Sequence, residues 1–270
     1  MTWRVFVADG SRVSAISEEL SAQSVAHRIV DVAGGIGPAV AGELRAGFTR
    51  IAVAGNDAIV AEAVESVLEE GLEGKIDLAI LPGGTKSDLL RTFALDQALG
   101  AAVRRMSHGN PYAIDVGVAE GTFGKVVFMN SVATGVLAGG PAWFPIWPRP
   151  LRAAGPVLIT AGTRPVETMA SGILVLNGQF WGDWVGAPRS TLVDGVVDLE
   201  VFTGPRRILA RLRRAFRSGN HVRGAGVRRL SVAHAVIDQP AGWIVTVDGV
   251  RLGRGSFTVA VIPGALRLSI

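Results

Sequence analysis

The chain has 270 residues, of which 49% are hydrophobic and 19% are charged, and its formal net charge is +4. This length suits one large domain or two ordinary ones, and the composition excludes the disordered and fibrous classes. Because it has no cysteine, disulfides, thiolate metal sites and cysteine nucleophiles are excluded. Basic and aromatic residues do not interleave, so we expect no nucleic-acid partner.

No targeting or membrane-spanning segment is predicted. The first ten residues lack the basic region and the long apolar region of a signal peptide. The most apolar stretch, residues 126–141, is shorter than the roughly 20 residues that span a bilayer, and Asn130 interrupts it. We therefore expect a cytoplasmic protein. Its excess of arginine over lysine has two explanations, a GC-rich genome or attraction to anionic lipid at the inner face of the membrane.

The first 112 residues alternate predicted strands and helices. Buried-type apolar runs predict strands at Trp3–Ala8, Arg50–Ala54 and Ile76–Leu81. A helix that stops at Gly71 is predicted by the helical spacing of Val60, Val64, Val67 and Leu68. A second helical pattern carries Leu99, Val103 and Met106. This alternation implies parallel pairing, so residues 1–112 are predicted to form an α/β domain with an open parallel sheet.

From Ala113 onward the pattern changes to short strands separated by glycine. The predicted strands are Ala113–Val118, Lys125–Ser131, Gly172–Leu176, Val196–Phe202, Leu230–Ile237, Trp243–Val247 and Ser256–Val261. Only Arg206–Arg217 is strongly helical in pattern. Residues 113–270 are therefore predicted to form a second domain, an antiparallel β-sandwich or barrel.

Two glycine-bearing turns follow predicted strands, at Ala54–Ala58 and at Pro82–Asp88. In an open parallel sheet, ligands bind at the carboxyl ends of the strands, and glycine lets the backbone approach them. Free N–H groups at the start of the next helix can bind phosphate, and Ser87 is placed to cap the second helix. Such turns are also common without any ligand, so a phosphate site is a hypothesis.

These turns carry a resemblance to a known family, the bacterial diacylglycerol-kinase-like lipid kinases. Val53–Glu62 resembles the family signature V-x-G-G-D-G-T-x-N-E, and Leu81–Arg91 resembles its P-L-G-T-x-N-D-F-A-R motif. Further motifs are similar, in order, at Ala113–Gly117, Val127–Asn130, Asn177-Gly178, Ala187-Pro188, Asp194–Asp198, Ser218–His221, Val247–Gly249 and Ile262–Arg267. The resemblance covers roughly residues 45–270. It implies a Rossmann-like first domain, related to that of NAD kinases, followed by a β-sandwich.

The resemblance also implies roles for individual residues. In the related kinases, ATP lies on the first domain and a lipid hydroxyl enters between the domains. Carried over by position, the nucleotide-binding residues are Gly55, Asn56, Asp57, Glu62, Gly83, Gly84 and Thr85. Asp248, in the D-G-E motif, is the expected general base, and Asp194 and Asp198 are the expected support for Mg²⁺. Phosphoryl transfer needs phosphate positioning, Mg²⁺ and a carboxylate that accepts the hydroxyl proton.

The sequence departs from the family pattern within the motifs that carry the expected nucleotide-binding residues and the expected general base. The departures are Asn56, Ala58, Ile59, Ala61, Ser87 and Val250. Side chains at Asn56 and Ala58 narrow the space for a phosphate, and Ile59 removes a hydroxyl. Asn tolerates left-handed backbone geometry, so we expect the turn at Asn56 to persist. The fold should therefore survive while nucleotide affinity falls.

Several candidate residues have a structural alternative. Val247–Val250 is a good hairpin signal, so Asp248 is either a catalytic base or a turn residue. Asp57 either serves a nucleotide site or favours a helix N-terminus electrostatically. The scattered histidines lack metal-ligand spacing. Ser131 and Thr134 have no nearby histidine that could activate them, so a hydrolase triad is poorly supported.

Three features suggest lipid, each with an alternative. The aromatic loop Pro141–Pro148, and Trp181 with Trp184, carry tryptophan, which is favoured at membrane interfaces. The helix Arg206–Arg217 is basic and amphipathic and can lie on anionic lipid. All of these apolar groups can instead pack onto their own domain.

We therefore expect an ATP- and Mg²⁺-dependent kinase that acts on the hydroxyl of a lipid or similar apolar alcohol. The alternative is a catalytically silent relative that binds lipid or nucleotide. A third class, an NAD-kinase-type enzyme, shares the first motif, but the second motif and the Asp194–Asp198 block argue against it. Peripheral contact with an anionic membrane is expected, and a homodimer is left open.

Overall fold

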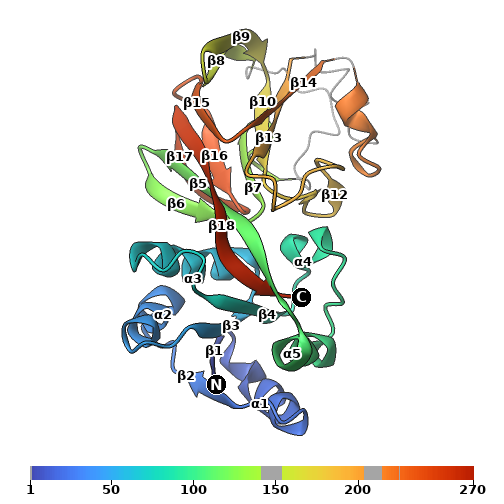
Figure 1. Ribbon diagram of the computed structural model, residues 1–270. Coiled ribbons are helices and arrows are strands. Elements are labelled where there is room, and N and C mark those ends of the chain that lie inside the picture. The colour runs from blue at the N-terminus through green and yellow to red at the C-terminus, as the bar shows by residue number, and fades with distance from the viewer. Residues whose placement is uncertain (1, 141–153, 204–214, 225) are drawn as a thin grey trace. The chain divides into compact units, whose positions relative to one another are not determined.

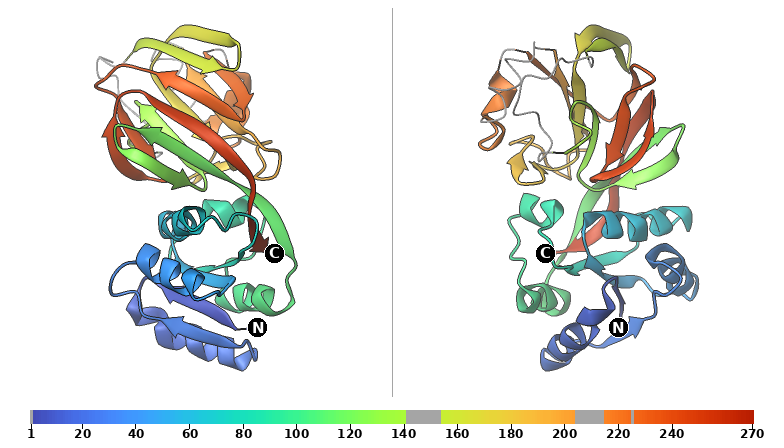
Figure 2. Two further views of the ribbon diagram at one scale, coloured as in Figure 1. Left: turned by 60° about the vertical axis from the view of Figure 1, so that its left-hand side comes forward. Right: turned by 180° about the vertical axis from the view of Figure 1, so that it is seen from behind.

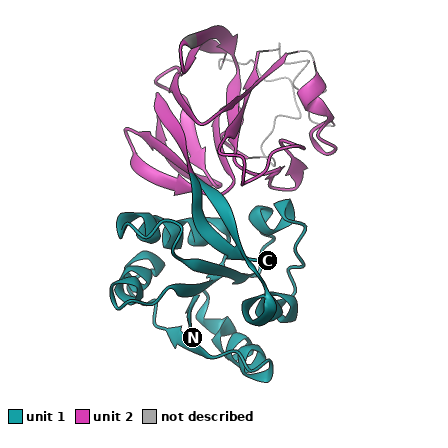
Figure 3. Cartoon of the chain, in the orientation of Figure 1, with its two compact units in different colours: residues 1–116, 263–270 teal, residues 117–262 magenta. Residues whose placement is uncertain are grey.

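The computed structural model describes residues 2–140, 154–203, 215–224 and 226–270 (Figure 1). The chain divides into two compact units, which are coloured separately in Figure 3. Unit 1 comprises residues 1–116 and 263–270, and unit 2 comprises residues 117–262. The aromatic loop Pro141–Pro148 lies outside the described residues, as does Arg206–Arg217 except for its last three residues.

Unit 1 is an open α/β sheet. Its strands are β1 (Trp3–Val7), β2 (His27–Val30), β3 (Arg50–Gly55), β4 (Asp77–Pro82) and the end of β18 (Phe257–Ser269). Its helices are η1 (Gly10–Arg12), α1 (Val13–Ala22), α2 (Ile36–Arg45), α3 (Asp57–Glu69), α4 (Asp88–Thr92) and α5 (Leu99–His108). The strands pair in parallel in the order β2-β1-β3-β4-β18. The predicted open parallel sheet is confirmed.

The helices of unit 1 cover its sheet on both faces (Figure 2). Alternate residues of β1, β3 and β4 pack against α1 and α5. In turn, α2 and α3 lie side by side and contact β1 and β3. Because both faces of the sheet are buried, β3 reads as an unbroken apolar run from Ile51 to Ala54.

The fifth strand of unit 1 comes from the far end of the chain. Arg267 and Leu268 of β18 pair in parallel with Asp77 and Leu78 of β4. Just before this pairing, β18 is held by Asp115, whose buried carboxylate accepts a hydrogen bond from the Gly264 N–H at 2.8 Å. The structure thus differs from the expected division at residue 112, because residues 263–270 return to unit 1.

Unit 2 is built from antiparallel strands. In chain order these are β5 (Pro111–Gly121, which begins in unit 1), β6 (Gly124–Phe128), β7 (Ser131–Gly135), β8 (Gly155–Ala161), β9 (Arg164–Ala170), β10 (Gly172–Leu176), β11 (Phe180–Trp181), β12 (Trp184–Val185), β13 (Val197–Phe202), β14 (Val227–Val232), β15 (His234–Asp238), β16 (Ile244–Val247), β17 (Val250–Arg254) and the first part of β18. A short 3-10 helix, η3, spans Asn220–Arg223.

Two sheets of unit 2 pack face to face. One runs β18-β15-β8-β9, with β5 pairing β18 and β6 pairing β5; the other runs β14-β13-β10-β7-β16-β17. Side chains from both sheets, among them Phe128, Ile173, Leu199 and Val259, form one buried core. Of the two predicted architectures, sandwich and barrel, the sandwich is confirmed.

Two predicted strands of unit 2 are each divided in the structure. The run predicted at Lys125–Ser131 breaks at Met129 and Asn130 into β6 and β7. The run predicted at Leu230–Ile237 breaks at Ala233 into β14 and β15, which belong to different sheets. Among the described residues, no helix combines the length and the apolar character needed to cross a membrane.

Candidate functional site

Three turns of unit 1 gather where β1, β3 and β4 end. They are Asp9–Arg12, Asn56-Asp57 and Gly83–Ser87. Since β2 lies on one side of β1 and β3 lies on the other, the strand order reverses between β1 and β3. This position, outside the carboxyl ends of parallel strands at the reversal point, is where open α/β sheets bind ligands.

Two of the predicted glycines are fixed by backbone packing. A Cβ atom on Gly83 would lie 2.3 Å from the carbonyl carbon of Gly55, so the two turns touch backbone to backbone. A Cβ atom on Gly55 would lie 2.5 Å from Cγ2 of Ile59. Both positions therefore require glycine for the fold, whether or not a ligand binds.

Asn56 begins helix α3 as its N-cap residue. Its backbone is extended, with φ of −79° and ψ of 175°, and its side-chain Oδ1 accepts a hydrogen bond from the Ile59 N–H at 3.0 Å. The turn at Asn56 persists as expected, and it needs no left-handed geometry. The side chain also uses one N–H that a phosphate at this helix end would need.

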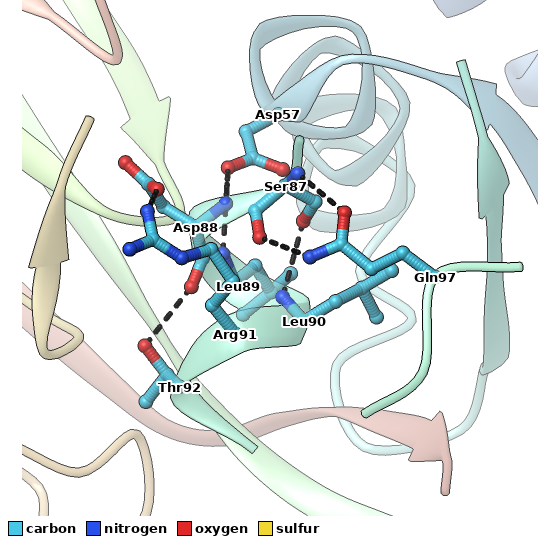
Figure 4. Close-up of polar contacts among 8 residues, drawn as sticks. All are labelled: Asp57, Ser87, Asp88, Leu89, Leu90, Arg91, Thr92 and Gln97. Carbon is cyan, nitrogen blue, oxygen red and sulfur yellow. Dashed lines mark hydrogen bonds and ion pairs between the residues drawn. The ribbon is translucent and has the colours of Figure 1, made fainter. Parts of the chain in front are cut away.

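Asp57 holds the second turn in place (Figure 4). Its Oδ2 accepts hydrogen bonds from the backbone N–H groups of Asp88 at 2.8 Å and Leu89 at 3.4 Å. The Ser87 hydroxyl oxygen accepts from the Leu90 N–H at 3.1 Å, so the predicted cap at Ser87 is confirmed. The N–H groups of Asp88, Leu89 and Leu90, at the start of α4, are thus satisfied by side chains and are not left for a phosphate.

A glutamine outside the predicted set completes this frame (Figure 4). Gln97 accepts a hydrogen bond from the Ser87 N–H at 2.9 Å and donates one to the Ser87 carbonyl at 3.1 Å. Asp88 in turn pairs with Arg91 at 2.7 Å. No family motif pointed to Gln97, since it lies beyond the motif and contacts the turn only through the tertiary fold.

The exposed part of the second turn is open to an anion. Gly84, Thr85 and Lys86 are exposed, and no hydrogen bond among the described residues uses their N–H groups. Gly84 has φ of +93°, and a Cβ atom there would lie 3.0 Å from Nη1 of Arg12. Backbone donors, the Lys86 ammonium and the Arg12 guanidinium therefore adjoin one loop, an arrangement that suits phosphate oxygens. Arg12 was not predicted, although it closely follows the first strand.

Glu62, the last predicted nucleotide residue, faces another helix. Its Oε1 accepts a hydrogen bond from the Gly37 N–H at 2.9 Å, near the start of α2. On the next turn of α3, the Ser66 hydroxyl donates to the Gly37 carbonyl at 3.0 Å. In the structure Glu62 thus caps α2 and joins it to α3, and its assignment to nucleotide stays a prediction.

In unit 2, Asp248 occupies a two-residue hairpin turn between β16 and β17. Val247 pairs with Val250, and both turn residues have positive φ, 43° at Asp248 and 84° at Gly249. This is a type I′ turn, so the hairpin prediction is confirmed. A non-glycine residue in this conformation is strained, and it persists only where its surroundings hold it in place.

Asp248 is held in place by its carboxylate, which binds the backbone at the break between β6 and β7. It accepts hydrogen bonds from the backbone N–H groups of Met129 at 2.6 Å, Asn130 at 3.0 Å and Ser131 at 2.8 Å. These donors stabilise the charged carboxylate. The break in the strand therefore presents three backbone donors to Asp248.

Three motifs of the family resemblance converge at this point. The buried Asn177 donates its backbone N–H to the Asn130 carbonyl at 2.8 Å and its side-chain amide to the Met129 carbonyl at 3.2 Å. Asn130, Asn177 and Asp248 are far apart in sequence, and together they form one polar centre in unit 2. We refer to these three residues as the Asp248 centre.

Asp194 and Asp198 do not present a joint metal site. Asp194 is exposed and accepts a hydrogen bond from the Val196 N–H at 3.3 Å. Asp198 is buried, forming an ion pair with Arg229 at 2.6 Å and a hydrogen bond with the Ser231 hydroxyl at 2.5 Å. Among the described residues, no three acidic or histidine side chains gather as metal ligands. The geometry thus does not fit Mg²⁺ on these two carboxylates.

Beside this pair lies a buried hydrogen bond between Glu200 and His221. His221 Nε2 and Glu200 Oε2 are 2.8 Å apart, and both side chains are fully buried. Burial raises the pKa of Glu200, and the hydrogen bond with His221 opposes this shift. The His221 ring stacks on Phe216 with a centroid distance of 3.7 Å, which fixes the start of η3 to the sandwich.

The tryptophans considered for lipid contact pack inside unit 2. Trp181 and Trp184 are 5% and 6% exposed, and their ring centroids lie 5.9 Å and 5.3 Å from that of Phe216. Phe216, at the end of the predicted basic helix, is fully buried. For these residues, packing onto their own domain is the explanation that the structure supports.

Unit 1 is an open α/β sheet with glycine turns, and unit 2 is a β-sandwich that carries an acidic centre. This combination defines a class of two-domain kinase folds. Residues 9–119 match the diacylglycerol kinase catalytic domain model. Residues 153–270 match the model of the YegS C-terminal NAD kinase beta sandwich-like domain. The two matches together support the assignment of the chain to the family of diacylglycerol-kinase-like lipid kinases, as a divergent member.

Known proteins agree with this family. A relative from Pseudomonas aeruginosa strain UCBPP-PA14, called "Probable lipid kinase YegS-like", is 28% identical over 84% of this chain and 78% of its own length. A solved structure of a diacylglycerol kinase from Bacillus anthracis str. Sterne is similar in fold, with a TM-score of 0.76, 18% identity and coverage of 99% and 96% of the two chains. An NAD kinase from Archaeoglobus fulgidus, solved in complex with ATP, has a TM-score of 0.57, 12% identity and coverage of 100% and 94%.

Proposed function

We propose that this protein is an ATP-dependent lipid kinase that transfers the γ-phosphate to a hydroxyl of a lipid or similar apolar alcohol, such as a diacylglycerol. The observation that carries the proposal is the exposed loop Gly84–Lys86 beside Arg12. Its N–H groups make no hydrogen bond among the described residues, and it lies where open α/β sheets bind phosphate.

In this proposal the nucleotide phosphates lie over Gly84, Thr85 and Lys86, and Arg12 neutralises charge that develops during transfer. Kinases need such positioning and electrostatic stabilisation more than covalent chemistry from the protein. Asp57 acts indirectly, since it holds the start of α4 and with it the loop. Mg²⁺ would arrive with the nucleotide, because this ion is commonly held by phosphates and only one or two carboxylates.

The Asp248 centre is proposed as the place where the acceptor hydroxyl loses its proton. Its carboxylate is held in one orientation by three backbone donors. A general base needs such a fixed position within hydrogen-bond reach of the proton that it takes.

The second candidate function is that of a silent relative that binds lipid or nucleotide without transfer. Asn56 favours it, since its side chain caps the Ile59 N–H and thereby uses a donor that a phosphate would need. The two candidates differ in one measurable respect, the transfer of phosphate to an alcohol.

The test combines binding with transfer. ATP with Mg²⁺ should raise the melting temperature, because a ligand that binds only the folded state stabilises it. Labelled phosphate from γ-labelled ATP should then appear on diacylglycerol presented in mixed micelles. Binding without transfer to any alcohol acceptor would favour the silent relative, and the lack of any thermal shift at millimolar ATP would exclude nucleotide binding.

A pair of variants locates the nucleotide. The double variant Arg12→Gln/Lys86→Gln removes both cations beside the loop and should abolish the thermal shift caused by ATP. The control is Arg28→Gln, which removes an exposed arginine of β2. An unchanged shift in the double variant would place the nucleotide elsewhere.

A further inference from the structure

Unit 2 contains a pocket of about 360 Å³ to which the family resemblance assigned no role. It is lined by Pro188, Arg189, Ser218, Gly219, Asn220, Val222, Arg223 and Arg229. Its volume lies within the range of small-molecule sites. All of its lining residues are in unit 2, so the pocket is separate from the loop Gly84–Lys86 of unit 1.

The lining of the pocket is strongly basic. Of the lining residues that the structure describes, three are arginines and none is acidic. Arg229 is the anchored member, with a side chain only 29% exposed and an ion pair to the buried Asp198 at 2.6 Å. Its buried Nε has no hydrogen-bond partner among the described residues. Asp198 offsets one of these three positive charges, and the buried Glu200, whose pKa is raised by burial, is also within electrostatic reach of Arg229.

The other two arginines retain their full charge for a ligand. Arg189 and Arg223 are exposed, and no ion pair among the described residues uses either one. Planar guanidinium groups bind phosphate oxygens in pairs, which a single ammonium cannot do. The neutral donors Ser218 and Asn220 lie beside them in the lining.

The frame of the pocket is rigid. Gly219 has φ of +71°, and a Cβ atom there would lie 2.2 Å from Cγ of Pro188, so the two lining loops are in direct contact. His221, which begins the turn that carries Arg223, is fixed by Glu200 and by stacking on Phe216. The backbone that carries these arginines is therefore held in place before an anion binds, and only the exposed side chains lose conformational freedom on binding.

We propose that this pocket binds a phosphate monoester, carried either by a lipid headgroup or by a small soluble ester. A dianionic phosphate balances the excess charge of the lining, and its oxygens match the guanidinium groups of Arg189, Arg223 and Arg229. The inference does not rest on kinase activity, since it concerns binding within unit 2 alone. It gives this unit an anion site apart from the Asp248 centre.

The experiment measures binding without nucleotide, using two probes. sn-Glycerol 3-phosphate is titrated by calorimetry, and phosphatidylcholine vesicles with or without phosphatidic acid are used in co-sedimentation. The test variant is Arg189→Gln/Arg223→Gln, and the matched control is Arg228→Gln/Arg251→Gln, which removes two exposed arginines of unit 2 that do not line the pocket. The variant Arg12→Gln/Lys86→Gln reports any binding at the unit 1 loop.

The test variant should bind at least about tenfold more weakly, a loss of roughly 1.4 kcal/mol, while the control and the unit 1 variant bind as the wild type does. Weakening of glycerol 3-phosphate binding would support a site for soluble esters. Weakening only with vesicles that contain phosphatidic acid would support a lipid headgroup. Equal weakening in the test and control variants would overturn the proposal, as would a lack of binding to both probes. Phosphate transfer is measured separately, so failure here does not decide the kinase proposal.

Discussion

The carboxylate of Asp57, at the start of α3, lies 2.8 Å from the backbone nitrogen of Asp88, at the start of α4. One side chain therefore joins the two turns that resemble the family's motifs. A direct role in nucleotide binding is not needed to explain an aspartate at this position, because the second turn depends on it. The first predictions concern this dependence.

Asp57→Asn should destabilise the protein by about 1–3 kcal/mol, because an amide replaces a charged acceptor of backbone hydrogen bonds. Chemical denaturation measures the free energy of unfolding. The effect should be accompanied by weaker ATP binding, since the loop Gly84–Lys86 loses its support. Asp31→Asn, at an exposed turn, is the control and should change neither quantity. Loss of ATP binding at unchanged stability would instead show that Asp57 contacts the nucleotide.

Gly83→Ala should destabilise the protein by about 3 kcal/mol, because its Cβ atom would overlap the backbone of Gly55. The matched control is Gly42→Ala in the exposed interior of α2, where a Cβ atom meets nothing within 4 Å. That change should stabilise the protein by about 0.5–1 kcal/mol. Thermal unfolding of both variants checks the pair. A harmless Gly83→Ala would mean that the two turns are farther apart than the structure has them.

The local parts of the fold could be predicted from the sequence. Apolar runs and helical spacing identified β1, β3, β4 and α3, and Val247–Val250 identified a hairpin. These elements depend on patterns within a few residues. The return of β18 to unit 1 could not be predicted in this way, because the pairing of Arg267 with Asp77 joins residues that are far apart in the chain. The division of one apolar run at Ala233 between two sheets leaves no local signal either.

The same distinction holds for the candidate site, where local patterns predicted some residues and the tertiary fold brings in others. The glycines and Ser87 were identified by motif and turn chemistry, and Gly55 and Gly83 do make the close approach that glycine permits. Arg12 and Gln97 were missed, because each reaches the second turn only through the tertiary fold. The turn at Asn56 was expected to persist because asparagine tolerates left-handed geometry. Instead, its short side chain caps α3 in an extended conformation, the commonest role of asparagine at a helix start.

The buried pair of Glu200 and His221 predicts a pH dependence of stability. Burial raises the pKa of Glu200, so the folded state holds its proton more tightly than the unfolded state does. The resulting stabilisation is fully present below the unfolded pKa, about 4.3, and is lost as the pH rises through the raised folded value. Glu200→Gln removes this titration and should be more stable than the wild type at neutral pH.

The comparison is made by measuring the free energy of unfolding of both proteins across the acidic to neutral range. The advantage of Glu200→Gln should shrink as the pH falls toward 4, roughly the unfolded value. The exposed Glu167 of β9 provides a control, since Glu167→Gln should run parallel to the wild type. A variant that is less stable at neutral pH would mean that the charged hydrogen bond to His221 outweighs the cost of burial.

Asp248→Asn should lower both activity and stability, because its carboxylate holds three backbone N–H groups in addition to any catalytic role. The amide oxygen can keep the two bonds made to Oδ1, but the amide nitrogen cannot accept the Met129 N–H, and the loss should be about 1.5–3 kcal/mol. Phosphate transfer must therefore be measured at a temperature where the variant is fully folded. Asp248→Gly keeps the positive φ of the turn and removes the carboxylate. Near-normal transfer by either folded variant would restrict Asp248 to the turn.

The last prediction concerns the cap at the start of α3. Asn56→Gly removes the side chain that accepts the Ile59 N–H and leaves that donor free for a phosphate. ATP should then bind more tightly, as measured by the thermal shift per unit of nucleotide. The stability should fall by only roughly a few tenths of a kcal/mol, because glycine is itself tolerated at the N-cap.

The matched variant is Asn56→Asp, which keeps the cap and adds a negative charge at the same point. It should preserve stability, since an acidic cap suits a helix N-terminus, and it should weaken ATP binding by repulsion of the phosphates. Together the two variants show how ATP binding responds when the side chain and its hydrogen bond are removed, and when the hydrogen bond is kept and a charge is added. Weaker ATP binding in Asn56→Gly would mean that the asparagine is part of a working site for a different ligand. The fold would then still be that of a lipid kinase, but the reaction proposed here would not be the one that this protein performs.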